Sequence, residues 1–116
     1  MPSGIYFNTP QFSISMWIYP LTVGYYARVV DFGNGYGGLS DNILFSIDSG
    51  TPQLSNRKPI MAICPGGSCA YQSISSSSLI LNVWQLLVAT YDGTYLNVYI
   101  NGTLTSSLAA AYTLPI

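Results

Sequence analysis

One stretch of the chain, Trp84–Gly102, constrains the fold more than any other. It holds two apolar runs that are separated by Asp92-Gly93 and followed by Asn101-Gly102. Asp-Gly and Asn-Gly are strong hairpin signals, because both accept the positive φ that a type I′ turn requires. Between the turns the side chains alternate, which predicts a strand with one buried face. The apolar face is Leu96, Val98 and Ile100, and the other face is Tyr95, Asn97 and Tyr99.

A second alternating segment lies near the start of the chain, at Phe12–Tyr19, and Pro20 ends it. This pattern predicts another strand with one face in the core, because proline is poorly tolerated inside a sheet. The second face begins with serine and ends with aromatic residues, so we expect something to cover one end of the outer side of this sheet. The first face is Phe12, Ile14, Met16 and Ile18, and the second is Ser13, Ser15, Trp17 and Tyr19.

Turn-forming residues divide the rest of the chain into further short extended segments. We expect strands at 25–32, 42–48, 59–64, 70–74 and 103–108, and an extended apolar tail at 109–116. No segment shows a sustained helical repeat. A chain of 116 residues with this pattern predicts one all-β domain over residues 1–116, an antiparallel two-sheet sandwich.

The chain is short of charge. Charged residues make up 6% of it, against roughly 25% in an ordinary soluble domain. Three basic residues cannot follow a phosphate backbone, so we expect no nucleic-acid partner. The apolar runs are short and contain polar residues, so we expect no membrane span. Scarce charge also means little repulsion between copies, which favours association. The charged residues are Arg28, Arg57, Lys58, Asp31, Asp41, Asp48 and Asp92.

The two cysteines, Cys64 and Cys69, flank the turn sequence Pro65-Gly66-Gly67-Ser68. A turn there brings the two thiols together, which predicts a disulfide, with two free thiols as the alternative. A structural zinc site needs four ligands, and the chain has no histidine or further cysteine to supply them. Closing so short a loop contributes about 2 kcal/mol in the chain-entropy model. A disulfide also predicts an extracellular or cell-surface location.

The hairpin and the early strand together resemble the laminin G-like, concanavalin A-like jelly-roll superfamily. The matching motifs are Phe12–Pro20, Trp84, Thr90-Tyr-Asp-Gly-Thr94 and Leu96–Gly102, in the order and spacing of the family. The resemblance implies a jelly roll, and it says little about activity, because this fold hosts lectins, adhesion modules, hydrolases and structural repeats.

Within the motif, we expect Asp92 to accept backbone N–H groups of its own turn, with Gly93 in the left-handed conformation. Trp84 is expected to close one end of the core. The residues assigned to the fold motif are Trp17, Trp84, Asp92, Gly93, Asn101 and Gly102.

The chain departs from the family at its two ends. About ten residues precede Phe12 and fourteen follow Gly102, so the opening and closing strands of the family are missing or short. A jelly roll that lacks a strand exposes unpaired backbone groups along an apolar groove. We therefore expect an incomplete sandwich, completed by a strand from a neighbouring chain.

The residues needed for hydrolysis are absent from the sequence. It contains no Glu and no His, and its four Asp are not paired on one strand. Glycosidases of this fold need two carboxylates close together, and a Ser or Cys nucleophile needs a base. We expect no enzymatic activity and no cofactor. Calcium is a weaker alternative, because Asp31, Asp41 and Asn42 flank a Gly-rich loop and carry oxygen ligands.

Three tyrosines are candidate glycan contacts, Tyr25, Tyr26 and Tyr36, because they lie at strand ends or in loops where rings can stack on sugars. Tyrosine is also a common strand former, which explains them without a ligand. Asn101-Gly-Thr103 is an acceptor sequence for N-glycosylation, although its hairpin turn already explains Asn101.

Two functions from different classes remain. The first is a non-enzymatic extracellular structural module that self-assembles into a fibril or filament through exchange of terminal β-strands, so that its partner is a copy of itself. The alternative is a carbohydrate-binding, lectin-like adhesion module whose partners are glycans.

Overall fold

The computed structural model describes residues 11–33, 42–51, 53–65 and 68–111, and their regular structure is all β. Strand formation follows the alternation of side chains in the sequence, which is clearest in the first strand. The strands are β1 (Phe12–Ile18), β2 (Arg28–Gly33), β3 (Asn42–Ser46), β4 (Ile60–Cys64), β5 (Tyr71–Ile74), β6 (Gln85–Tyr91), β7 (Tyr95–Ile100) and β8 (Thr103–Ala109).

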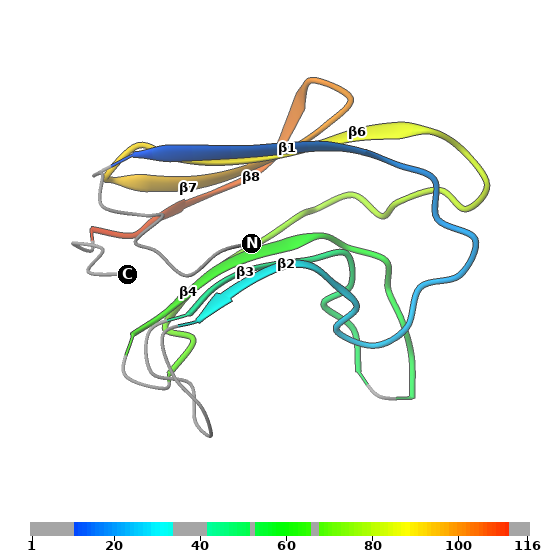
Figure 1. Ribbon diagram of the computed structural model, residues 1–116, viewed down its shortest axis with the longest axis horizontal. Coiled ribbons are helices and arrows are strands. Elements are labelled where there is room, and N and C mark those ends of the chain that lie inside the picture. The colour runs from blue at the N-terminus through cyan, green and yellow to red at the C-terminus, as the bar shows by residue number, and fades with distance from the viewer. Residues whose placement is uncertain (1–10, 34–41, 52, 66–67, 112–116) are drawn as a thin grey trace.

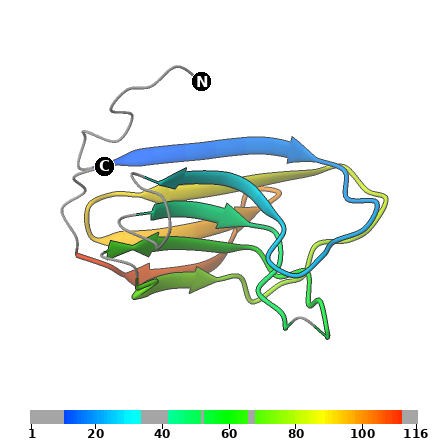
Figure 2. The same cartoon turned by 60° about the horizontal axis from the view of Figure 1, so that its bottom comes forward.

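These strands form two antiparallel four-stranded sheets that lie face to face as two layers (Figures 1 and 2). Sheet A has the order β1-β6-β7-β8, and sheet B has the order β2-β3-β4-β5. The chain therefore crosses between the layers twice, from β1 to β2 and from β5 to β6. This arrangement confirms the predicted all-β jelly-roll sandwich.

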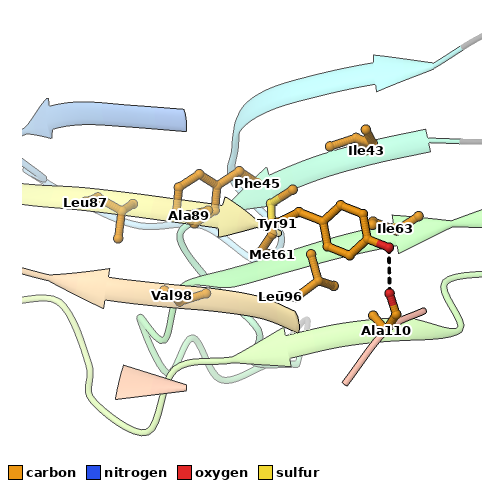
Figure 3. Packing of buried hydrophobic residues seen from close by; sticks show 10 residues of the cluster. All are labelled: Ile43, Phe45, Met61, Ile63, Leu87, Ala89, Tyr91, Leu96, Val98 and Ala110. Atoms are coloured by element: carbon orange, nitrogen blue, oxygen red, sulfur yellow. Dashed lines mark hydrogen bonds between the residues drawn. The ribbon is translucent and has the colours of Figure 1, made fainter. Parts of the chain in front are cut away.

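The core lies between the sheets and is filled from their central strands (Figure 3). Tyr91 has the largest fully buried side chain, and its hydroxyl donates a hydrogen bond to the Ala110 carbonyl oxygen at 2.7 Å. The ring is thus surrounded by apolar groups while its one polar atom is satisfied. The buried cluster is Ile43, Phe45, Met61, Ile63, Leu87, Ala89, Tyr91, Leu96, Val98 and Ala110.

The start of the predicted apolar tail belongs to its own sandwich. Ala109 ends β8, and the buried Ala110 also donates its N–H to the Thr94 carbonyl oxygen at 2.7 Å. Residues 112–116 lie outside the described residues. The chain up to Ala110 is therefore held in place by its own hairpin.

The sandwich is closed more tightly along one long side than along the other. Between β5 and β8, the Ser73 and Ser106 hydroxyl oxygens are 2.9 Å apart, and just beyond β5 the Ser75 Oγ donates to Thr105 Oγ1 at 2.9 Å. Along the opposite side, the inward side chains of the edge strands β1 and β2 are only partly buried. They are Phe12, Ile14, Met16, Ile18, Val30 and Phe32. An incomplete sandwich stays a prediction, because residues 1–10 also lie outside the described residues.

The two turns of the central hairpin region differ in type. Asn101 and Gly102 have φ of 51° and 80° and form the whole loop between β7 and β8, as a type I′ turn requires. At the first turn, Gly93 has φ of 94°, but Asp92 is not in the positive-φ region. The type I′ prediction is therefore wrong at Asp92-Gly93.

The Asp92 side chain shapes this first turn. Its Oδ1 accepts the N–H groups of Thr94 and Tyr95 at 2.8 and 2.7 Å, as the motif predicted. These two bonds, first that from Tyr95 and then that from Thr94, hold the pKa of the Asp92 carboxyl below its usual value. The turn between β6 and β7 is thus formed by the Asp92 carboxylate and the left-handed Gly93, and it is not the predicted type I′ turn.

The strand predicted at 25–32 begins only at Arg28. Tyr26 has φ of 50°, and the Ala27 N–H donates to the Gly24 carbonyl oxygen at 3.1 Å, so residues 24–27 form a turn. The strand propensity of the two tyrosines misleads here, because the chain must cross from sheet A to sheet B at this point.

The predicted disulfide joins Cys64, at the end of β4, to Cys69 in the loop before β5. The alternative of two free thiols is excluded. The Gln72 side chain donates to the Cys69 carbonyl oxygen at 2.7 Å, which ties the loop to the strand that follows it.

A buried carboxylate shapes the connection between β3 and β4. The strand predicted at 42–48 ends at Ser46, and the fully buried Asp48 then accepts four hydrogen bonds from the loop it begins. The donors are Ser55 Oγ at 2.8 Å, Asn56 N at 2.8 Å, Arg57 N at 2.7 Å and Gly50 N at 3.1 Å. Burial alone raises the pKa of Asp48, but these four donors together hold it below its usual value.

We predict that Asp48→Asn destabilises the domain by about 1–3 kcal/mol at neutral pH, because an amide presents N–H groups to N–H donors. Since the folded-state pKa is lowered, the contribution of Asp48 is present above its unfolded-state pKa and is lost as pH falls through its folded-state pKa. Urea unfolding at several pH values measures both effects. The gap between wild type and variant should shrink in acid.

Asp31→Asn is the matched control, because Asp31 is exposed on β2 and pairs with Arg28 at the surface. Its effect should stay within about 0.5 kcal/mol. An Asp48→Asn variant as stable as the control at neutral pH would contradict the assigned role.

Candidate interaction face

The outward face of sheet A carries the largest group of exposed aromatic side chains among the described residues. In β1 the inward side chains pack on the core, so Trp17 points away from it. In β6 the inward positions include Leu87 and Ala89, so Leu86 and Val88 point outward as well. Trp17 and Leu86 are direct cross-strand partners, which places them side by side on this face.

Three aromatic residues meet at one end of this face, and we call them the aromatic cluster: Trp17, Tyr19 and Trp84. Tyr19 and Trp84 extend the two paired strands by one residue each, and their ring centroids lie 5.4 Å apart in a tilted contact. The exposed fractions are 64% for Trp17, 43% for Tyr19 and 63% for Trp84. Both tryptophans of the chain are thus displayed to solvent.

The position of Trp84 corrects one prediction. Trp84 was expected to close an end of the core, and it instead lies on the surface. Gln85, the next residue, occupies the inward position and is buried. Because side chains alternate along a strand, an inward Gln85 requires an outward Trp84.

Gln85 fixes the loop that presents Trp84. Its Oε1 accepts the Ile80 N–H at 3.0 Å, and its Nε2 donates to the carbonyl oxygens of Ile80 and Val83 at 2.9 and 3.2 Å. The loop also includes Asn82, whose φ is 57° and whose N–H donates to the Pro20 carbonyl oxygen at 2.8 Å. One buried amide therefore anchors the segment between β5 and β6 beside the end of β1.

Aliphatic and polar residues both lie near the aromatic cluster. Leu21 and Val83 are exposed next to the bonded pair Pro20 and Asn82. Leu86 lies opposite Trp17 and is half-buried. Polar side chains lie near the rings as well, since Asn82 is exposed two residues before Trp84 and the Asn101 Oδ1 accepts the Leu86 N–H at 2.9 Å.

The face also has no charge. The four strands of sheet A contain no Asp, Glu, Lys or Arg. Away from the aromatic cluster the same face turns polar, with Thr90 and Asn97 on neighbouring strands and the Asn97 amide donating to the Thr90 hydroxyl at 3.4 Å. The largest group of exposed apolar side chains thus lies at one end of the sheet, whereas a single exposed tyrosine, Tyr95, points outward at the other end.

The sequence predicted that something covers the aromatic end of this sheet, and the structure shows which side chains are left uncovered there. Nothing in the described residues lies over Trp17 or Trp84 closely enough to bury them. The alternation in the first strand predicted that Trp17 and Tyr19 lie on its outer face. It did not predict that Trp84 lies beside them or that Gln85 anchors the neighbouring loop. The inward positions of β6 alternate, and extending this alternation back from Leu87 places Gln85 inward and Trp84 outward.

The predicted glycan contacts lie elsewhere. Tyr25 and Tyr26 are in the connection between β1 and β2, with ring centroids 4.8 Å apart and nearly perpendicular rings. Tyr36 lies outside the described residues. The side chain of the exposed Asn101 is engaged through Oδ1, which accepts the Leu86 N–H at 2.9 Å, and its glycosylation stays a prediction.

The candidate calcium ligands are not brought together by the described residues. Asp31 pairs with Arg28, and Asp41 lies outside the described part of the chain. Asn42 Oδ1 is buried without a hydrogen-bond partner in that part. Where the structure describes the chain, it shows no group of three or more acidic, Cys or His residues suited to a metal. Calcium binding stays a prediction.

The described aspartates do not form a catalytic pair either. Asp31 is ion-paired on β2, Asp48 is saturated by four donors, and Asp92 caps a hairpin. Within the described ranges, no helix has the length and apolarity needed to cross a bilayer.

The comparisons with known proteins agree with the fold. The whole chain, residues 1–116, matches a laminin G family described as the Concanavalin A-like lectin/glucanases superfamily, and the protein belongs to this family. No curated protein matches the chain. The family contains both binding proteins and enzymes by its description, so function has to be argued from the residues present.

We predict that Gln85→Met, which keeps the volume but removes three hydrogen bonds, destabilises the domain by about 1–3 kcal/mol and loosens the loop that carries Trp84. In a Trp17→Phe background, Trp84 is the only tryptophan, so its fluorescence anisotropy reports on the loop. The anisotropy should fall in the variant.

Gln72→Met is the matched control, because Gln72 is half-buried and donates one bond at a different loop. It should leave the Trp84 signal unchanged. Equal anisotropy in the two variants would show that Gln85 does not anchor the loop.

Proposed function

We propose that this domain is a non-enzymatic, extracellular structural module whose copies associate with one another. The observation that carries the proposal is the uncharged outward face of sheet A with its exposed aromatic cluster. Exposed apolar patches of this kind mark interaction surfaces in soluble proteins. A net charge of −1, from three basic and four acidic residues, leaves little electrostatic repulsion to keep copies apart.

An extracellular location is supported by the disulfide between Cys64 and Cys69. The absence of Glu and His from the sequence, together with the structural roles of Asp48 and Asp92, supports a function that is not enzymatic.

Growth into a fibril or filament through strand exchange is the finer part of this proposal. It is supported by the half-buried inner faces of β1 and β2, which leave room for additional apolar contacts along one side of the sandwich. Ala110 is held by Tyr91 and Thr94, and the Gln11 side chain donates to the Asp92 carbonyl oxygen, so a donated strand would come from residues before Gln11 or after Ala110. A head-to-tail exchange of this kind propagates unless the rotation between copies closes it.

The proposal predicts that the purified protein is larger than one 12.5 kDa chain. Light scattering coupled to size exclusion, with electron microscopy of the same fractions, measures mass and particle shape. Because the contact is apolar, the mass should persist as salt is raised, whereas a charged contact would weaken. A single 12.5 kDa species at every accessible protein concentration would refute self-association.

Carbohydrate binding is the second candidate, and a specific observation favours it. Tyr25 and Tyr26 form an edge-to-face pair in a loop, and Tyr25 is 47% exposed, which offers a ring and a hydroxyl to a sugar. The family description also includes lectins.

This candidate predicts that Tyr25→Ala lowers glycan binding without changing the unfolding temperature. A glycan array probed with and without calcium gives the ligand, and titration of the best hit gives the loss in affinity. Tyr95→Ala is the matched control, because Tyr95 is 46% exposed on β7. An array without hits in either condition, or equal losses in both variants, would count against a lectin role.

A further inference from the structure

We infer that the contact between copies is made by the outward face of sheet A against the same face of a second copy, with the aromatic cluster at its centre. This inference rests on the proposed function and names the surface and partner that serve it. It differs from strand exchange, which would use the edges of the sheets.

The first argument is area. A large aromatic side chain buries about 150–250 Å², and the exposed fractions of Trp17, Tyr19 and Trp84 leave roughly 350 Å² of aromatic surface per copy. A stable interface buries about 800 Å² per partner, with an apolar centre and a more polar rim. The aromatic cluster therefore supplies nearly half of such a contact, and Leu21 and Val83 extend it.

The second argument is chemical. A charged partner would find no counter-charge on the strands of sheet A. A sugar needs free hydrogen-bonding groups around the rings. Here the Gln85 amide is buried and engaged, and the Asn101 Oδ1 already accepts the Leu86 N–H. The side chains of Leu21, Val83 and Leu86 offer no polar atom. A second copy needs neither a counter-charge nor free hydrogen-bonding groups, because an apolar face is complementary to itself. Two copies in contact would also desolvate no charge on these strands.

The third argument concerns geometry. The aromatic cluster lies on the β1 and β6 side of the sheet, whereas the tip of the β7–β8 hairpin rises from sheet A on the side away from sheet B (Figure 1). A register shift between Val98 and Tyr99 marks where the pairing of these strands is irregular. At this tip the Asn101 N–H donates to the Leu86 carbonyl oxygen at 2.8 Å, and the Asn101 Oδ1 accepts the Leu86 N–H at 2.9 Å. The tip therefore borders the aromatic cluster on the same face, and it leaves a second copy the β1 side of the cluster.

A two-fold axis through the cluster satisfies these conditions. It places the apolar end of one face on the apolar end of the other and leaves polar positions such as Thr90 and Asn97 toward the rim. A contact in which both copies use the same surface closes on itself as a dimer. Longer assemblies would then need a second contact, for which the strand edges remain.

The test uses the full chain and its two tryptophans, which are the only ones present. Sedimentation equilibrium gives the dimer dissociation constant, and tryptophan emission over the same dilution series reports whether the rings become buried. We expect the emission of the wild type to shift to shorter wavelength as dimer forms. Trp17→Ser and Trp84→Ser should each raise the dissociation constant at least about 30-fold, as for a central aromatic hot spot.

Leu54→Ser is the matched control, because Leu54 is 72% exposed but lies in the loop between β3 and β4. Its dissociation constant should stay within about twofold of the wild type, as expected for an apolar side chain outside the contact. Thermal unfolding of each variant verifies that the fold is retained. The dilution series on the wild type tests burial of the tryptophans even if a variant fails to fold.

The possible failures are distinguishable. If the wild type assembles while both tryptophans stay exposed and the variants assemble equally well, this inference is wrong and self-association stands. If the wild type is monomeric throughout, both fail. If it is monomeric and its emission changes on adding a glycan, the face binds sugar and the inference is overturned.

Discussion

The packing of β6 and β7 against β3 and β4 is the contact on which the rest of the molecule depends. Leu87, Ala89 and Tyr91 occupy every second position of β6 and meet the buried strands of sheet B. Because a strand has a period of two, this choice of inward residues also fixes which side chains are left outside. The exposed aromatic cluster is thus a direct consequence of how the core is filled.

Much of the fold could be predicted from the sequence, since alternation marks β1 and β7 clearly and Asn101-Gly102 specifies its turn. The errors have local causes. Tyr25 and Tyr26 have strand propensity, yet the crossover between sheets needs a turn there. Asp92 takes its conformation from bonds made by its own side chain, which an Asp-Gly pair alone does not reveal.

The candidate interaction face was harder to foresee, because its parts are far apart in the sequence. Trp17 and Trp84 are brought together only when β1 pairs with β6. The prediction that Trp84 closes the core fails because Gln85 takes the inward position of β6 and so places Trp84 outside. Gln85 is the buried anchor of the adjoining loop, and the sequence alone does not reveal which carbonyl oxygens its amide reaches.

The loop that begins at Asp48 has a property of another kind. Three of its four bonds to Asp48 come from backbone N–H groups, those of Gly50, Asn56 and Arg57. Of these positions, Gly50 leaves no room for a side chain, because a Cβ there would overlap the Leu54 carbonyl oxygen. One carboxylate therefore encodes much of the shape of this loop, together with the backbone bridge between Thr51 and Leu54, and exposed side chains such as that of Leu54 contribute little to it. A framework of this kind lets a surface vary in sequence during evolution, or receive a designed peptide, while the sandwich beneath it stays the same.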